Sequence, residues 1–277
     1  SIILRCGKIA NPDELAVKPN YKLKLTPYAY MYLNASYGGQ SPIQIKAEPN
    51  KEYEIQYQGD SADIIKIYNA SFLKSIGDLS TIYAGTIDVS KATKMTELII
   101  GNETEGYDNP YLNTLTTGSN VLLEKLNIEN VSGLTQSLDF SDKTLEDGTV
   151  VEGLKNLKEL YAHGSNISGA IFADGGKIET AELPAIGSLE MKNLMYLSTL
   201  DISSFDKLTK LVVEECDTID LIPILNSAKN LNRVRIIGVE WTLETADLLN
   251  RLYKMDGIDG DGYNTEQSVL SGNVKIL

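Results

Sequence analysis

Apolar residues recur between Ile87 and Ile237 in one short pattern, in which an apolar residue is followed at three, five and eight positions by further apolar residues. Alternate residues of a β-strand point to opposite faces, so the fourth and sixth positions of this pattern point inward and the fifth points outward. One unit cannot cover its own apolar face, whereas stacked units cover each other. The pattern occurs seven times: Met95-Leu98-Ile100, Leu123-Leu126-Ile128-Val131, Leu157-Leu160-Ala162-Ser165, Ile178-Ala181-Leu183-Ile186, Leu197-Leu200-Ile202-Phe205, Leu208-Leu211-Val213-Cys216 and Leu231-Val234-Ile236-Val239.

This spacing is the leucine-rich-repeat signature. It predicts a mainly β fold, classed as α/β in repeat classifications, in which the chain winds into a right-handed solenoid. We expect Leu126, Leu160, Leu200 and Val234 to lie in one interior column. Further apolar units fall about half a turn between the seven, so short strands are expected on more than one side of the solenoid, without long helices.

Both ends of a solenoid expose the apolar face of a terminal unit and need caps. Residues 28–33, 43–47 and 52–58 alternate as strands do, which predicts a β-rich cap at the N-terminus. Residues 242–255 carry an apolar stripe at helical spacing, and a closing strand is expected from Val269. The sequence therefore predicts an N-terminal cap, an irregular leucine-rich-repeat solenoid and a C-terminal helix-plus-strand cap: residues 1–60, 61–240 and 241–277.

Composition narrows the class of protein. The 277 residues are 42% hydrophobic and carry a net charge of −13. Binding to nucleic-acid phosphates needs a basic stripe, which this acidic chain lacks, and no stretch reaches the 18 apolar residues that insert into a bilayer. Two cysteines, Cys6 and Cys216, cannot build a disulfide framework and are expected to be free thiols. The chain begins at Ser1 rather than Met, so we expect a piece of a longer protein.

Residues that could carry chemistry are sparse. His163 is the only histidine, and no G-x-S-x-G segment accompanies it, so neither a Ser-His-Asp triad nor a zinc site is expected. The acidic turn Asp256-Gly257-Ile258-Asp259-Gly260-Asp261 could hold calcium weakly, but it departs from the EF-hand pattern. A glycosidase needs a pair of carboxyl groups, and no pair stands out among the 38 acidic residues. We therefore expect a chain without catalytic activity, cofactor or metal.

Two sets of residues are candidates for ligand binding. Fifteen tyrosines against four phenylalanines favour recognition, because tyrosine combines a large contact area with a polar tip. The densest group is Tyr28, Tyr30 and Tyr32, whose alternation predicts one face of a strand. The second set is the outward fifth position of each unit, expected to form one exposed stripe: Ile99, Asn127, Tyr161, Glu182, Asp201, Val212 and Arg235.

Four segments resemble leucine-rich-repeat structural and surface proteins encoded by phages and prophages of gut Firmicutes. They are Tyr28-Ala29-Tyr30-Met31-Tyr32-Leu33-Asn34, Leu98-Ile99-Ile100-Gly101, Glu240-Trp241-Thr242-Leu243 leading to Leu249-Asn250-Arg251-Leu252-Tyr253, and Gly262-Tyr263-Asn264-Thr265-Glu266-Gln267-Ser268-Val269. The resemblance implies an extracellular component of a phage tail or virion, or a bacterial surface protein, and it brings no catalytic residues.

The expected function is a non-enzymatic recognition or adhesion module, which binds a protein or carbohydrate on a bacterial or host cell surface, or other domains of the same longer chain. Two alternatives stay open at this point. One is a polysaccharide depolymerase that uses a carboxylate pair, and the other is a purely structural spacer.

Overall fold

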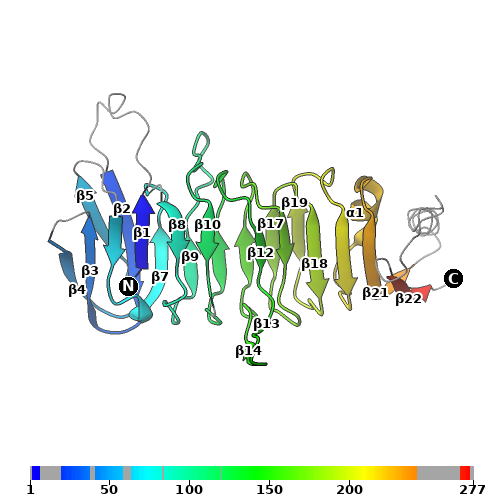
Figure 1. Cartoon of the computed structure of the whole chain (residues 1–277), viewed down its shortest axis with the longest axis horizontal. Helices are drawn as coiled ribbons and strands as arrows, with labels where there is room; N and C mark the ends of the chain where they lie inside the picture. The colour runs from blue at the N-terminus through cyan, green and yellow to red at the C-terminus, as the bar shows by residue number, and fades with distance from the viewer. Residues whose placement is uncertain are drawn as a thin grey trace. The chain divides into compact units, whose positions relative to one another are not determined.

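The computed structural model describes residues 2–6, 20–37, 41–58, 64–82, 84–118, 120–241 and 269–274. The chain forms two compact units. Unit 1 comprises Ser1–Gln136 and Glu159–Asn166, and unit 2 comprises Ser137–Lys158 and Ile167–Leu277. Both consist mainly of β-strands, as the apolar pattern predicts (Figure 1).

Unit 1 contains two sheets. In the first, neighbouring strands follow the order β10-β8-β1-β6-β3-β4, and in the second they follow the order β5-β2-β7-β9-β11-β15. Pairing is antiparallel among the N-terminal strands and becomes parallel from β8–β10 and β7–β9 onward. The strands are β1 (Ile2–Cys6), β2 (Asn20–Pro27), β3 (Met31–Tyr37), β4 (Ile43–Ala47), β5 (Tyr53–Gln58), β6 (Ile64–Ile67), β7 (Leu73–Asp78), β8 (Ala84–Asp88), β9 (Glu97–Ile99), β10 (Thr114–Thr116), β11 (Lys125–Asn127) and β15 (Glu159–Tyr161).

The core of unit 1 lies on the inward faces of its strands. Ile76, Leu98, Leu126 and Leu160 are register partners along four parallel strands, and all four are fully buried. Each such side chain contributes roughly 1.5–3 kcal/mol of burial free energy. Successive strands from β7 to β11 belong alternately to the two sheets, which confirms the prediction of short strands on more than one side.

Unit 2 repeats this alternation. One sheet has the order β12-β16-β18-β20-β21-β22 and is parallel throughout, while β17 and β19 pair with each other in parallel. Buried register partners on successive strands of the larger sheet form a column, and we call each such residue a rung of the column. The rungs Ala170, Leu189, Leu211 and Val234 are separated by 19, 22 and 23 residues. The strands are β12 (Ser137–Asp139), β16 (Gly169–Ile171), β17 (Thr180–Leu183), β18 (Ser188–Lys192), β19 (Thr199–Ile202), β20 (Lys210–Glu214), β21 (Arg233–Trp241) and β22 (Val269–Val274).

The single interior column expected from the sequence is wrong. Leu200 lies in β19 and Val234 in β21, and these strands belong to different sheets. The cause is the half-turn spacing: consecutive apolar units alternate between two sheets, so units that look equivalent in the sequence face each other across the core rather than stack. The structure has two buried columns where one was expected.

The unit that contains Ile219 also departs from the pattern. In place of a strand, the chain forms a short helix, α1 (Leu221–Ser227), which Asp220 caps by accepting a hydrogen bond from the backbone N–H of Ile222 at 3.0 Å. Leu221, Ile224 and Leu225 are its buried residues, at the spacing of one helix face. The segment forms a helix rather than a strand, because the Asp220 cap and the apolar residues on one helix face favour the helix.

The ends and one insertion complete the description. The strands expected at residues 43–47 and 52–58 are confirmed as β4 and β5. The expected helix at residues 242–255 and the acidic turn from Asp256 to Asp261 lie outside the described residues. Between β12 and Leu154, the chain inserts a hairpin of β13 (Lys143–Thr144) and β14 (Val150–Val151), which extends away from the other strands of unit 2 in Figure 1.

Candidate functional site

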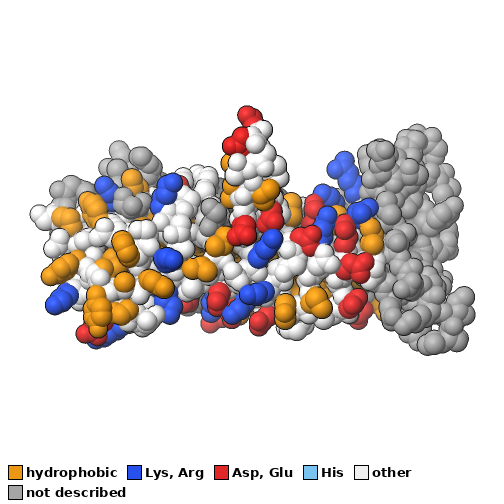
Figure 2. All heavy atoms as spheres, turned by 90° about the horizontal axis from the view of Figure 1, so that it is seen from below, with side chains coloured by type: hydrophobic (Ala, Val, Ile, Leu, Met, Phe, Trp, Pro, Cys, Tyr) orange, Lys and Arg blue, Asp and Glu red, His pale blue; other side chains and the backbone are white. Residues whose placement is uncertain are grey.

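Four exposed aromatic side chains come from neighbouring segments of unit 1. Tyr28 and Tyr30 lie in the bend between β2 and β3, Tyr32 is the second residue of β3, and Phe72 ends the short 3₁₀ helix η2 (Ala70–Phe72). Their exposed fractions are 52%, 77%, 57% and 51%. We call these four residues the aromatic patch. Figure 2 shows hydrophobic side chains over the N-terminal strands, with basic side chains around them.

The strand expected at residues 28–33 forms only in part. Residues 28–30 are a bend, because β2 and β3 belong to different sheets and the chain must cross between them. The backbone N–H of Tyr28 donates to the carbonyl of Phe72 at 2.7 Å, which brings the bend against η2. The crossing therefore adds an aromatic residue that the sequence pattern did not single out.

Lysine side chains lie close to the aromatic patch. Lys94 Nζ lies 5.6 Å from the ring centroid of Tyr28, within the range of a cation–π contact. Lys46 on β4 is the register partner of Tyr32 on β3. An exposed surface of rings beside ammonium groups can stack on sugar rings or on apolar side chains and can attract acidic groups.

Three of the outward residues line up in unit 1. Ile99, Asn127 and Tyr161 are register partners on β9, β11 and β15, and all three are half-buried. Lys125 Nζ lies 5.4 Å from the centroid of the Tyr161 ring and 3.4 Å from a carboxylate oxygen of Glu159. Lys125 thus links the ring of Tyr161 with the carboxylate of Glu159, so the row of outward residues has mixed polarity.

The outward residues of unit 2 form two separate pairs. Glu182 and Asp201 are register partners on β17 and β19, and Val212 and Arg235 are register partners on β20 and β21. The pairs belong to different sheets, so the expected single stripe is wrong. The cause is again the alternation of successive units between sheets.

Val212 is also not exposed as expected, because only 7% of it is accessible. Its register partners, Glu190 on β18 and Arg235 on β21, lie on either side of it. Their side chains pair diagonally with Lys210 and Glu214, and the long apolar stems of such residues cover the surface that they cross. Val212 is therefore shielded by an ionic network rather than presented to a ligand.

That network perturbs one carboxyl group. Arg235 Nε donates to Glu214 Oε1 at 2.7 Å, and Lys192 Nζ lies 3.2 Å from the same oxygen. The hydrogen bond from Arg235, followed by the contact with Lys192, holds the pKa of Glu214 below its usual value, against the opposing effect of partial burial. The carboxylate is thus stabilised as an ion-pair partner, which is a structural role.

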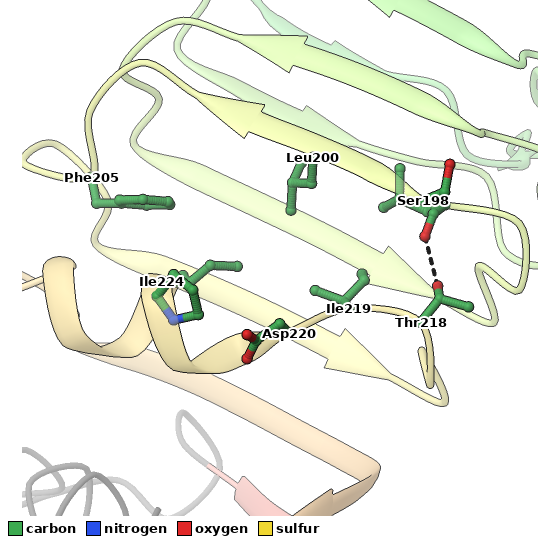
Figure 3. A pocket seen from close by; sticks show the side chains of 9 residues that line it. Ser198, Leu200, Phe205, Thr218, Ile219, Asp220 and Ile224 are labelled. Atoms are coloured by element: carbon green, nitrogen blue, oxygen red, sulfur yellow. Dashed lines mark hydrogen bonds between the residues drawn. The ribbon is translucent and has the colours of Figure 1, made fainter.

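A cavity of about 260 Å³ opens in unit 2 beside β19 (Figure 3). The apolar side chains of Leu200, Phe205, Ile219 and Ile224 point into it, although polar atoms contribute more of its exposed lining than apolar atoms do. Part of its rim is polar, because Thr218 Oγ1 donates a hydrogen bond to the carbonyl of Leu197 at 2.7 Å. Besides the four apolar side chains, the cavity is lined by Leu197, Ser198, Thr218, Asp220 and Pro223. Sequence reasoning missed this cavity, because the unit that contains Ile219 fits the strand spacing and the pattern alone does not predict the helix beside it.

The residues considered for chemistry occupy structural positions. Ser165 is buried, and its hydroxyl donates to the carbonyl of Ala162 at 2.7 Å, which satisfies a turn. Cys216 is a buried free thiol, and burial raises its pKa, so the reactive thiolate is disfavoured. Among the described residues there is no group of three or more His, Cys, Asp or Glu side chains that could hold a metal ion. The helices in the described part of the chain are all too short or too polar to cross a membrane.

Comparisons of the chain with protein-family models, with curated proteins and with solved structures found no match.

Proposed function

We propose that this chain is a non-enzymatic recognition module that binds a protein or glycan on a bacterial or host cell surface. The observation that carries the proposal is the aromatic patch, in which four large side chains of unit 1 are each more than half exposed. Exposing so many rings together is costly in water, and such patches in folded proteins mark interaction sites. Tyrosine is well suited to this role, because its ring packs and its hydroxyl forms hydrogen bonds.

The scaffold that presents the patch is proposed to be a leucine-rich-repeat-like right-handed solenoid, with residues 1–60 as its N-terminal cap and residues 241–277 as its C-terminal cap. The in-register columns of Ile76, Leu98, Leu126 and Leu160 in unit 1 support this proposal. The resemblance to phage and prophage surface proteins suggests that the module belongs to a virion or to a bacterial surface. It would then act outside the cell.

Binding of the fluorescently labelled protein to whole gut bacteria and to an array of surface glycans tests the proposal. The variant Tyr30→Ala/Tyr32→Ala should bind at least about tenfold more weakly, because two exposed rings at the centre of such a contact supply much of its free energy. Circular dichroism melting should remain unchanged, since both side chains are more than half exposed and leave little core behind.

Tyr196→Ala is the matched control. Tyr196 is 60% exposed, but it belongs to unit 2, whereas the aromatic patch belongs to unit 1. If Tyr196→Ala weakens binding as much as the double variant does, the effect is a loss of non-specific binding by exposed aromatic side chains, and the proposal fails. Unchanged binding of the double variant to every surface that the parent chain binds would also contradict it.

The same preparation separates the two other functions. Incubation with purified capsular polysaccharide should release no reducing ends. Their appearance would point to a depolymerase, and the register partners Glu182 and Asp201 would be the first carboxyl pair to replace. A chain that binds no cell or glycan and releases no sugar would behave as a structural spacer.

A further inference from the structure

Among the described strands, the sheet that contains β17 ends at β19, although the apolar repeat of the sequence continues to Ile219 on the same side. In the described part of the chain, β19 pairs with β17 alone. The next apolar unit on this side would place Ile219 beside Leu200, but the chain turns into α1 there. As a result Leu200 is only half-buried, whereas Leu98, Leu126 and Leu160 at the corresponding position are fully buried. One rung of the column is missing.

The edge of β19 that faces away from β17 keeps its hydrogen-bonding groups. The backbone N–H groups of Thr199 and Ser203 donate to Glu179 and Leu183, so the alternation of a parallel strand turns the groups of Leu200 and Ile202 to the other edge. At the position that corresponds to Ile202, Ile128 donates to the carbonyl of Tyr161 on the following strand. No such following strand is present beside Ile202 in the described residues.

The space beside this edge is the cavity of Figure 3. Leu200 and Phe205 approach it from β19 and the turn after it, and Ile219 and Ile224 approach it from the segment that leads into α1. A cavity of roughly 150 Å³ has room for a benzene ring, so the 260 Å³ here has room for a large side chain, which would contact the four apolar residues that point into it. The open edge of β19 therefore combines strand-pairing groups with a pocket into which four apolar side chains point.

The charge at the rim of the cavity indicates which kind of peptide it would bind. Asp220 is the one charged residue among those that line the cavity. Asp217 precedes the lining residue Thr218, and both aspartates are exposed. An occupant that carries a lysine or arginine beside its apolar anchor gains attraction from these carboxylates, whereas an acidic occupant is repelled.

We propose that this site binds an extended peptide segment of a partner protein, which adds to β19 as a further strand, inserts one large apolar side chain between Leu200 and Ile219, and places a basic side chain near Asp220. Backbone pairing with an open strand edge supplies affinity, and the pocket supplies specificity for the alternate side chains. The site lies in unit 2, so it is independent of the aromatic patch and of the proposed surface recognition.

A displayed library of short random peptides, selected on the whole chain, tests this proposal. Enriched sequences should share a large apolar residue with a lysine or arginine within two positions of it. A synthetic peptide of the enriched sequence should lose binding when alternate backbone nitrogens are methylated, and should keep it when the intervening ones are. This alternation is specific to strand pairing, since a side chain that merely fills a pocket does not produce it.

Two variants and one control place the peptide. Asp220→Asn keeps the oxygen that caps α1 and removes the charge, so binding of the basic peptide should weaken about fivefold, and less at high salt. Leu200→Trp fills the cavity and should weaken binding at least about tenfold. Asp201→Asn removes a charge from the opposite face of β19 and should leave the affinity unchanged.

Three outcomes overturn the proposal. The first is a selection that enriches no peptide above a selection on an unrelated protein. The second is a peptide whose affinity is the same for the parent chain, Asp220→Asn and Leu200→Trp. The third is a methylation series without alternation. Loss of cell or glycan binding in the aromatic-patch variant has no bearing on this result, so the two proposals fail separately.

Discussion

At Gly101, two segments of unit 1 approach so closely that no side chain fits. A Cβ atom at this position would lie 2.2 Å from the backbone oxygen and 2.3 Å from the backbone nitrogen of Glu129. The N–H of Gly101 also donates to the carbonyl of Asn127 at 3.2 Å, which ties the segments together. Backbone atoms cannot rotate away as a flexible side chain can, so the close approach requires glycine.

Gly101→Ala should therefore lower the free energy of unfolding by about 2–3 kcal/mol, in the range of overpacked cores. Chemical denaturation followed by circular dichroism measures this. Gly187→Ala is the control, because its added Cβ meets a carbonyl oxygen at 3.3 Å and needs only a small adjustment. A loss as large in Gly187→Ala as in Gly101→Ala would mean that glycine flexibility, and not the contact with Glu129, sets the cost.

At this scale the sequence predicted that Tyr28 and Tyr30 are exposed, but for an incomplete reason. Alternation predicted a strand through Tyr28 and Tyr30, whereas a bend between two sheets exposes both. It also predicted an exposed Val212, which neighbouring ion pairs cover. Periodicity gives the direction in which a side chain leaves its strand. Its accessibility depends on neighbours that come from distant segments.

At the scale of elements, strands β18, β20 and β21 are linked by ion pairs, and two of these ion pairs, with Lys192 and Arg235, share the carboxylate of Glu214. Arg235 lies within hydrogen-bond distance, and the side chain of Glu214 is 20% exposed, so water screens the pair only in part. The folded-state pKa of Glu214 is lowered relative to the unfolded chain. The pair therefore stabilises the fold above the unfolded pKa, and this contribution is lost as the pH falls through the folded pKa.

A double-mutant cycle of Glu214→Gln and Arg235→Gln should give a coupling free energy of about 1 kcal/mol at neutral pH. The coupling should shrink once the pH falls below about 4.3, the ordinary value for glutamate, and vanish in more acidic solution. Denaturation of the four chains across this pH range measures it. A coupling that stays constant down to pH 2 would show that the two side chains interact through packing rather than through charge.

The short strands were predictable as elements because their apolar residues alternate, whereas α1 was not. The unit from Cys216 to Ile224 fits the strand spacing, but Asp220 supplies a helix cap and the residues after it share one helical face. Two local preferences compete at such a position, and the pattern alone does not decide between them. The cavity beside β19 follows from that decision, so it was beyond the reach of the sequence as well.

At the scale of the whole molecule, columns of buried residues on parallel strands recur in both units, and each such residue has its register partners on the two adjacent strands. In unit 1 the column from Ile76 to Leu160 shows this in register, and in unit 2 the column from Ala170 to Val234 does so. If the proposed solenoid is correct, its stability is a sum of local terms. A substitution in one strand then destabilises that strand and the strands adjacent to it, and leaves the others unchanged.

Hydrogen exchange of two conservative core variants tests this locality. Ile100→Val lies in unit 1 and Ile236→Val lies in unit 2, and both parent side chains are fully buried. Each substitution should lower local stability by about 0.5–1.5 kcal/mol, which accelerates amide exchange severalfold. Ile100→Val should act on β9 and β11, Ile236→Val on β20 and β21, and the double variant should show both effects without a third. Exchange that accelerates across both units in either single variant would instead show one cooperative core, and stacked local units would then be the wrong description of this chain.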